Sequence, residues 1–108
     1  MITVTYRKKY NMLHIEGHAY SGEAGHDLVC SAASILAYTM AANLENAKAC
    51  GYVKEVHLDM KPGDAVVRCT PAKKYQNTVE LVIQTILTGF SLLARDYDRY
   101  IKLCVKAQ

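Results

Sequence analysis

The sequence predicts an α+β fold, a two-layer sandwich in which two helices pack on one face of a mostly antiparallel sheet. Five short segments alternate apolar and polar residues, as half-buried strands do, and two long segments are rich in apolar residues and helix formers. They follow one another in the order β-β-α-β-β-α-β, which suits two layers around one core. The chain has 108 residues, so we expect a single domain over residues 1–108.

The first two strands are predicted over residues 2–7 and 12–18. β-branched and aromatic residues occupy every second position from Ile2 to Tyr6, and the alternation resumes after a turn at residues 8–11. We therefore expect these two strands to pair as a hairpin.

The remaining elements follow from the same two periodicities and from turn residues. A glycine-containing loop is expected between the second strand and the first helix, and a Lys-Pro-Gly-Asp turn closes a second hairpin. The predicted elements are a loop at 19–26, a helix at 28–50, strands at 52–59 and 65–70, a helix at 73–97 and a strand at 100–106.

Asp27 is a plausible N-cap of the first long helix, because its carboxylate can accept hydrogen bonds from the unpaired amides of a first turn. Gly51 ends this helix. Apolar residues cover much of its circumference, which indicates a central helix or one that also faces a partner subunit.

Composition and charge narrow the functional classes. Thirteen Lys and Arg residues against ten Asp and Glu give a net charge of +3, with no basic block beyond residues 7–9 and 73–74, so we expect no direct nucleic-acid partner. We find no signal peptide and no apolar run of roughly 20 residues, and we expect a cytoplasmic protein without a membrane span.

The four cysteines are widely spaced, which suits a reducing compartment better than a disulfide framework. We interpret Cys50, Cys69 and Cys104 as buried structural thiols. His14 and His18 share a strand face but lie roughly 13 Å apart, so one metal ion cannot bridge them. We expect no metal site, and no glycine motif indicates a cofactor.

The strongest indication of a catalytic function lies in residues 17–30. His18 falls at a strand end, and Cys30 is predicted in the first turn of a helix, where free backbone amides favour a thiolate and can hold an oxyanion. A histidine on the adjacent strand can take the thiol proton and later protonate a leaving amine. This pair therefore predicts cysteine acyl transfer.

Other interpretations of the same residues stay open. A cysteine on a helix is a common core residue, and a histidine at a strand end is commonly solvated. His26 is a rival base, and Asp27 either orients His18 or only caps the helix. Tyr20 and Tyr38 are candidates to line a pocket that accepts an aromatic side chain.

Several residues between 17 and 34 resemble the signature of Prp, the bacterial ribosomal-processing cysteine protease family. They are Gly17-His18, the loop glycines Gly22 and Gly25, and Asp27-x-Val29-Cys30-x-Ala32-Ala33-Ser34. Chain length and element order are similar too, although His26 and Ala33 depart from the residues expected there.

By this resemblance, His18 is the general base and Cys30 the nucleophile, with Asp27 and Ser34 in support. The family implies cleavage after a pair of phenylalanines in the N-terminal extension of a bacterial large-subunit ribosomal protein, the twenty-seventh, by a homodimer. The segment containing Gly17, Tyr20, Ser21, Gly22 and Gly25 would then be the flap that closes over this peptide.

Two alternatives compete with a protease. One is a noncatalytic ribosome-associated module that binds basic protein or ribosomal RNA through its sheet, with Cys30 merely packed. The other is an acyl- or thioester-transfer enzyme that uses the same pair on a small molecule. Thiol reactivity separates the first from an enzyme, because a packed cysteine is inert.

Overall fold

The computed structural model describes residues 1–17 and 24–108, with side chains described outside residues 18–27. It confirms the α+β class and the predicted order of strands and helices, with two short 3₁₀ turns added. The elements are β1 (Ile2–Arg7), η1 (Lys8–Tyr10), β2 (Met12–Glu16), α1 (Ala24–Ala49), β3 (Val53–Lys61), β4 (Asp64–Pro71), η2 (Lys73–Tyr75), α2 (Gln76–Asp96) and β5 (Ile101–Lys106).

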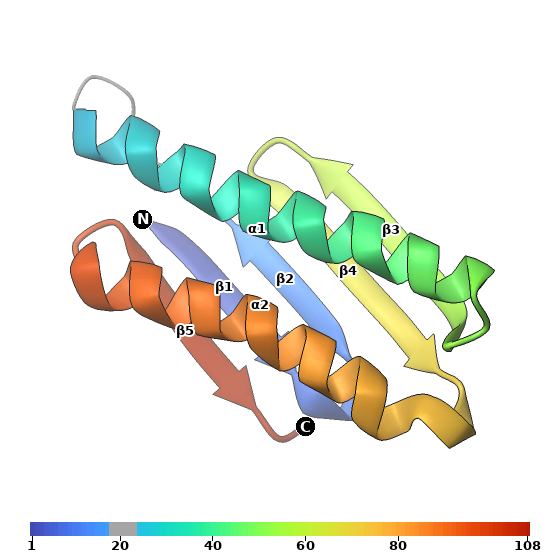
Figure 1. Ribbon diagram of the computed structural model, residues 1–108. Coiled ribbons are helices and arrows are strands. Elements are labelled where there is room, and N and C mark those ends of the chain that lie inside the picture. Colours follow the sequence, from blue (N-terminus) through green and yellow to red (C-terminus); the bar gives the residue numbers. More distant parts are fainter. Residues whose placement is uncertain (18–23) are drawn as a thin grey trace.

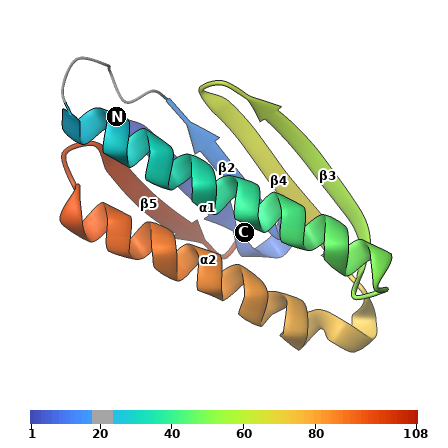
Figure 2. The ribbon, with the colours of Figure 1, turned by 45° about the horizontal axis from the view of Figure 1, so that its top comes forward.

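The five strands form one open sheet in the order β3-β4-β2-β1-β5. Three of the four neighbouring pairs are antiparallel, and β1 and β5 pair in parallel. Both helices lie on the same face of this sheet, and no other described element covers the opposite face (Figures 1 and 2). The sheet is therefore mixed but mostly antiparallel, as predicted.

The period-two pattern places the apolar side of each strand against the helices. Ile2, Val4 and Tyr6 of β1 are buried, and the residues between them are partly exposed. On β2, Leu13 is fully buried opposite Val67 of β4. The alternation seen in the sequence thus corresponds to the two faces of the sheet.

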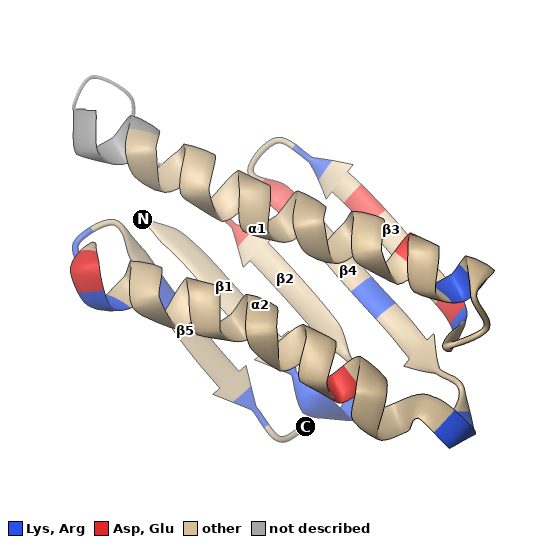
Figure 3. Cartoon of the chain, in the orientation of Figure 1, with Lys and Arg blue, Asp and Glu red and all other residues tan. Residues whose placement is uncertain are grey.

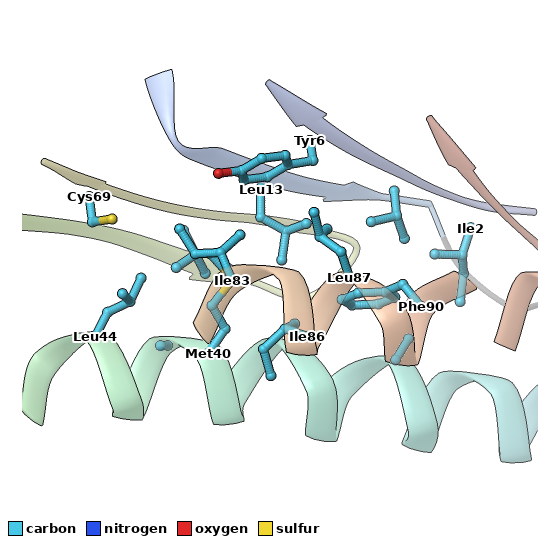
Figure 4. Packing of buried hydrophobic residues seen from close by; sticks show 14 of the residues in the cluster. Ile2, Tyr6, Leu13, Met40, Leu44, Cys69, Ile83, Ile86, Leu87 and Phe90 are labelled. Carbon is cyan, nitrogen blue, oxygen red and sulfur yellow. The ribbon is translucent and has the colours of Figure 1, made fainter. Parts of the chain in front are cut away.

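The core lies between the sheet and the two helices (Figure 4). α2 contributes larger side chains, whereas α1 contributes several alanines, which allow a close approach. Gly89 of α2 faces Leu36 of α1 closely enough that a Cβ there would lie 2.6 Å from Leu36 Cδ2. The buried helix residues are Val29, Ala33, Ala37, Met40, Ala41 and Leu44 on α1, and Val79, Ile83, Ile86, Leu87 and Phe90 on α2.

The start of α1 differs from the prediction. The helix begins at Ala24, so Asp27 lies within its first turn instead of at the N-cap, and Gly25 belongs to the helix instead of the preceding loop. A capping residue favours a helix start but does not prevent the chain from adding hydrogen-bonded residues before it. The second predicted strand also ends earlier, at Glu16.

Leu28–Ala49 and Lys73–Asp96 are long and apolar enough to cross a membrane by length and composition alone. This differs from the expectation that no apolar run approaches that length. Both segments bury one side against the sheet, as core helices of a globular protein do.

Candidate active site

A cavity of about 320 Å³ lies between the first half of α1 and the turn that joins β3 to β4. Its walls come from four parts of the chain and are mainly apolar, with Ser34, Lys61 and Asp64 as polar members. The lining residues are Ile2, Ile15, Gly17, Cys30, Ala33, Ser34, Ala37, Tyr38, Met60, Lys61, Pro62, Gly63, Asp64 and Ala65.

Cys30 forms part of the wall of this cavity. Its side chain is half-buried and packs against the hydrophobic core, and the sulfur is a free thiol. The core therefore holds the cysteine in place while the cavity gives access to it.

The other three cysteines lie elsewhere and differ from one another. Cys69 is 3% exposed on β4, and burial raises the pKa of its thiol to about 11, which keeps it protonated and inert near neutral pH. Cys104 is half-buried on β5. The expectation that Cys50 is buried is wrong: α1 ends at Ala49, and Cys50 is exposed in the turn that follows.

The position of Cys30 along α1 corrects the prediction about its backbone surroundings. Because the helix begins at Ala24, the unpaired amides of the first turn belong to residues 24–27, and Cys30 lies in the second turn. The prediction that Cys30 lies in the first turn of the helix, among its unpaired amides, is therefore wrong.

Gly17 is held where β2 meets the cavity. Its N–H donates a 2.9 Å hydrogen bond to the carbonyl of Gly63 in the β3–β4 turn. Its φ is +97°, and a Cβ at this position would overlap the carbonyl oxygen of Met1. Only glycine fits this combination of backbone angle and close approach.

Several predicted site residues lie outside what the structure describes. These are His18, Tyr20, Ser21 and Gly22, together with the side chains of His26 and Asp27. Their relation to Cys30 stays a prediction.

Ser34 and Tyr38 lie on the same side of α1 as Cys30, at successive helical turns, and both line the cavity. Ser34 is exposed. The idea that Tyr38 lines a pocket near the cysteine agrees with this lining.

Sequence reasoning did not find the opposite wall, which the β3–β4 turn provides. The Lys61-Pro62-Gly63-Asp64 signature identified the turn but contained no information about its distance from Cys30. Asp64 joins this wall to the sheet, because Nε2 of His14 donates to its Oδ1 at 2.6 Å. Nδ1 of His14 faces Oε1 of Glu16 at 3.5 Å.

Within residues 1–17 and 28–108, no His, Cys, Asp and Glu side chains cluster as a metal site would require.

The geometry suits a cysteine that acts on an extended ligand. The thiol lies in the wall of an open cavity, apolar side chains provide a surface for a substrate side chain, and charged groups stand at the β3–β4 turn. Lys61 is held at 3.6 Å from Asp59, and Asp64 is held by His14.

Solved structures with the same fold include proteases. A crystal structure of the essential ribosomal processing protease Prp from S. aureus, with a covalently linked product peptide, is 25% identical, covers 98% of this chain and 100% of its own, and has a TM-score of 0.71. The same S. aureus protease with a substrate peptide is 22% identical, with 97% of each chain covered and a TM-score of 0.70. A Streptococcus mutans protein is 23% identical over 99% of this chain and 93% of its own, with a TM-score of 0.70.

Curated protein sequences give no significant match. The family model described as cysteine protease Prp, in contrast, matches residues 1–102, nearly the whole chain. This match, together with a thiol in the wall of an open cavity, favours an enzyme over a noncatalytic module. The chain therefore belongs to the Prp family of cysteine proteases.

Proposed function

We propose that this protein is an endopeptidase in which Cys30 is the nucleophile and His18 the general base. The observation that carries the proposal is the half-buried thiol of Cys30 in the wall of a cavity of about 320 Å³. His18 directly follows Gly17, which lines the same cavity and is tied to the β3–β4 turn. This connection supports a histidine that acts at the thiol.

The proposed reaction has two steps. His18 takes the thiol proton as the sulfur attacks the peptide carbonyl, and it returns the proton to the leaving amine as the C–N bond breaks. This leaves a thioester on Cys30. Water, deprotonated by His18, then attacks the thioester, which releases the new carboxylate and restores the thiol.

Asp27 and Ser34 are the proposed supporting residues. By helical spacing, positions 27, 30 and 34 follow one another along one face of α1. Because α1 begins at Ala24, Asp27 is not needed as its N-cap, and this favours an orienting role toward His18.

The proposed substrate is the N-terminal extension of the twenty-seventh large-subunit ribosomal protein, cut after a pair of phenylalanines. Support comes from the resemblance to Prp, from the peptides bound to the S. aureus protease and from the apolar lining that Ile15, Ala33 and Met60 contribute. Gly17, Tyr20, Ser21, Gly22 and Gly25 are proposed to belong to the peptide-binding segment.

In this proposal, residues 1–108 form a single protease domain. The protein is located in the cytoplasm and acts as a homodimer. Leu28 and Ile35 of α1 are 61% and 63% exposed, and these apolar side chains support a protein contact on this helix. Light scattering after gel filtration tests the dimer: twice the chain mass is expected, and the chain mass would contradict it.

The decisive experiment is cleavage of a synthetic peptide that spans the extension, read by mass spectrometry. Wild type should make a single cut after the phenylalanine pair, and Cys30→Ala and His18→Ala should make none. Cys50→Ala is the matched control, because it removes an exposed thiol remote from the cavity. Full cleavage by Cys30→Ala would refute the assigned nucleophile, and intact peptide with wild type would refute the substrate.

A further inference from the structure

The chain contains two short turns of identical sequence that lie outside the lining of the Cys30 cavity. η1 and η2 both read Lys-Lys-Tyr, and both are 3₁₀ turns. In each, a lysine lies over the neighbouring ring: Nζ of Lys9 is 5.8 Å from the ring centroid of Tyr10, and Nζ of Lys74 is 5.6 Å from that of Tyr75. Each turn thus presents cations beside an aromatic ring.

The sheet brings these two turns to the same end of the molecule. β1 leads into η1, β4 leads through Pro71 into η2, and both strands pair antiparallel with β2, so they run in the same direction. A hollow of about 290 Å³ lies between η1 and the segments that flank η2, Pro71 on one side and Gln76 and Asn77 of α2 on the other. Figure 1 shows that η1 and η2 lie at the same end of the sheet. The hollow is lined by Tyr6, Lys8, Lys9, Asn11, Pro71, Gln76, Asn77, Glu80 and Gln84.

Other cations gather at this end, which we call the basic end. It is where β1, β4, β5 and α1 end and where β3 and α2 begin (Figure 3). Its Lys and Arg residues are Arg7, Lys8, Lys9, Lys48, Lys54, Arg68, Lys73, Lys74 and Lys106, and the acids near it are Glu45, Glu55 and Glu80. Positive charge therefore predominates here.

The opposite end of the molecule, which holds the Cys30 cavity, carries more acids. Among the side chains that the structure describes, these are Glu16, Asp59, Asp64, Asp96 and Asp98, against Lys61, Arg95, Arg99 and Lys102. The modest net charge of +3, from which we expected no nucleic-acid partner, thus conceals a polarised distribution along the 45 Å length of the molecule.

Two local features add to the basic end. α2 begins beside the hollow with no acidic residue in its first turn and no side-chain cap, so the positive end of its helix dipole is not neutralised there by its own first turn. Tyr10 is 49% exposed next to Lys8 and Lys9. An exposed ring beside paired cations suits a base next to its phosphate.

We propose that the basic end binds the phosphate backbone of RNA, with an unpaired base stacked on Tyr10. Lys8 and Lys9 at the hollow, and Lys73 and Lys74 of η2 beyond Pro71, would contact different phosphates of one backbone. This role goes beyond peptide hydrolysis and does not depend on it. Because the Cys30 cavity lies at the other end, RNA and a peptide can be bound together.

The test measures fluorescence anisotropy of a labelled, unstructured RNA of roughly 15 nucleotides. Lys8→Ala/Lys9→Ala is compared with Arg99→Ala/Lys102→Ala, which removes the same charge from the opposite end. All four side chains are exposed, so both variants should keep the fold, which a thermal melt verifies. Peptide cleavage by both variants, measured in parallel, should equal that of wild type.

Loss of two phosphate contacts should weaken RNA binding roughly 25-fold at about 0.1 M salt and reduce the salt slope by about 1.4. We expect Lys8→Ala/Lys9→Ala and Lys73→Ala/Lys74→Ala to show this loss and Arg99→Ala/Lys102→Ala to bind as wild type does. Equal weakening by the control would overturn the assigned location. No saturable RNA binding by wild type would overturn the proposal, as would binding to phosphatidylserine vesicles without binding to RNA.

Discussion

The N–H of Gly17 donates a 2.9 Å hydrogen bond to the carbonyl of Gly63, and this bond joins the end of β2 to the β3–β4 turn beside Cys30. Two walls of the cavity are thereby held together at the point where the chain leads on to His18. The backbone at Gly17 has a φ of +97° and lies against the carbonyl of Met1, so this link depends on the absence of a side chain.

We predict that Gly17→Ala destabilises the protein by at least about 2 kcal/mol and lowers peptide cleavage, because both the backbone angle and the contact with Met1 resist a Cβ. Denaturant unfolding and cleavage rates check this. Gly51→Ala is the control, since its φ is +85° with open space around the Cβ position, and it should cost only about 1 kcal/mol. Equal costs for the two variants would show that the contact with Met1 has no influence.

Alkylation should distinguish the cysteines by environment. We expect Cys30 to react with iodoacetamide faster than the exposed Cys50, because the proposed base, His18, takes the thiol proton as the sulfur attacks. Cys69 should react only after unfolding. Mass spectrometry of timed samples measures each rate, and His18→Ala should remove the advantage of Cys30. A Cys30 that labels more slowly than Cys50 in wild type would contradict the dyad.

Replacing Ser34 tests its proposed supporting role. Ser34→Ala should lower kcat/KM about tenfold, the effect of losing roughly one hydrogen bond at the reacting groups. Ser31→Ala is a matched control, because Ser31 is also exposed on α1 but does not line the cavity. Both variants should unfold within about 0.5 kcal/mol of wild type. An unchanged kcat/KM for Ser34→Ala would exclude the supporting role.

Stability should fall as the solution becomes alkaline. Burial raises the pKa of Cys69 from 9.0 to about 11, and burial, with Cys69 and Glu80 nearby, raises the pKa of Tyr6 from 10.0 to about 12. The unfolded chain therefore releases these protons at lower pH than the folded protein, so rising pH favours unfolding. The contribution of Cys69 is lost between pH 9 and 11, and that of Tyr6 between pH 10 and 12.

Thermal unfolding midpoints across this range test the assignment. Cys69→Ala should flatten the decline between pH 9 and 11, whereas Cys104→Ala, which leaves Cys69 in place, should retain it. An identical decline in all three proteins would place the titrating group elsewhere.

Local patterns in the sequence were sufficient to predict the strands and helices. Alternation from Ile2 to Tyr6 predicted β1, and helical spacing from Val79 to Phe90 predicted the buried face of α2. The first and last residues of an element were harder to predict, because several local signals compete near the end of a helix. Asp27 has the side chain of an N-cap, yet α1 begins at Ala24. Gly89 allows close contact between α2 and Leu36 of α1, a relation between two helices that no local pattern records.

For the candidate site, too, one part could be predicted from the sequence and another part could not. The spacing of His18 and Cys30 indicated cysteine chemistry because both residues are close in sequence, and the family match supports that class of enzyme. The wall opposite Cys30 is formed by residues 60–65, which are remote along the chain, and no local pattern records such a distance.

By itself, the sequence determined the fold class, the nucleophile candidate and the family resemblance, because each depends on periodicity or on residues close together in the chain. Only the tertiary structure decided that the β3–β4 turn forms the second wall of the cavity and that residues 8–10 and 73–75 lie at the same end of the sheet. The physical reason is strand pairing: β2 runs antiparallel to both β1 and β4, so the turns that follow those two strands emerge at the same end of the sheet, on either side of β2.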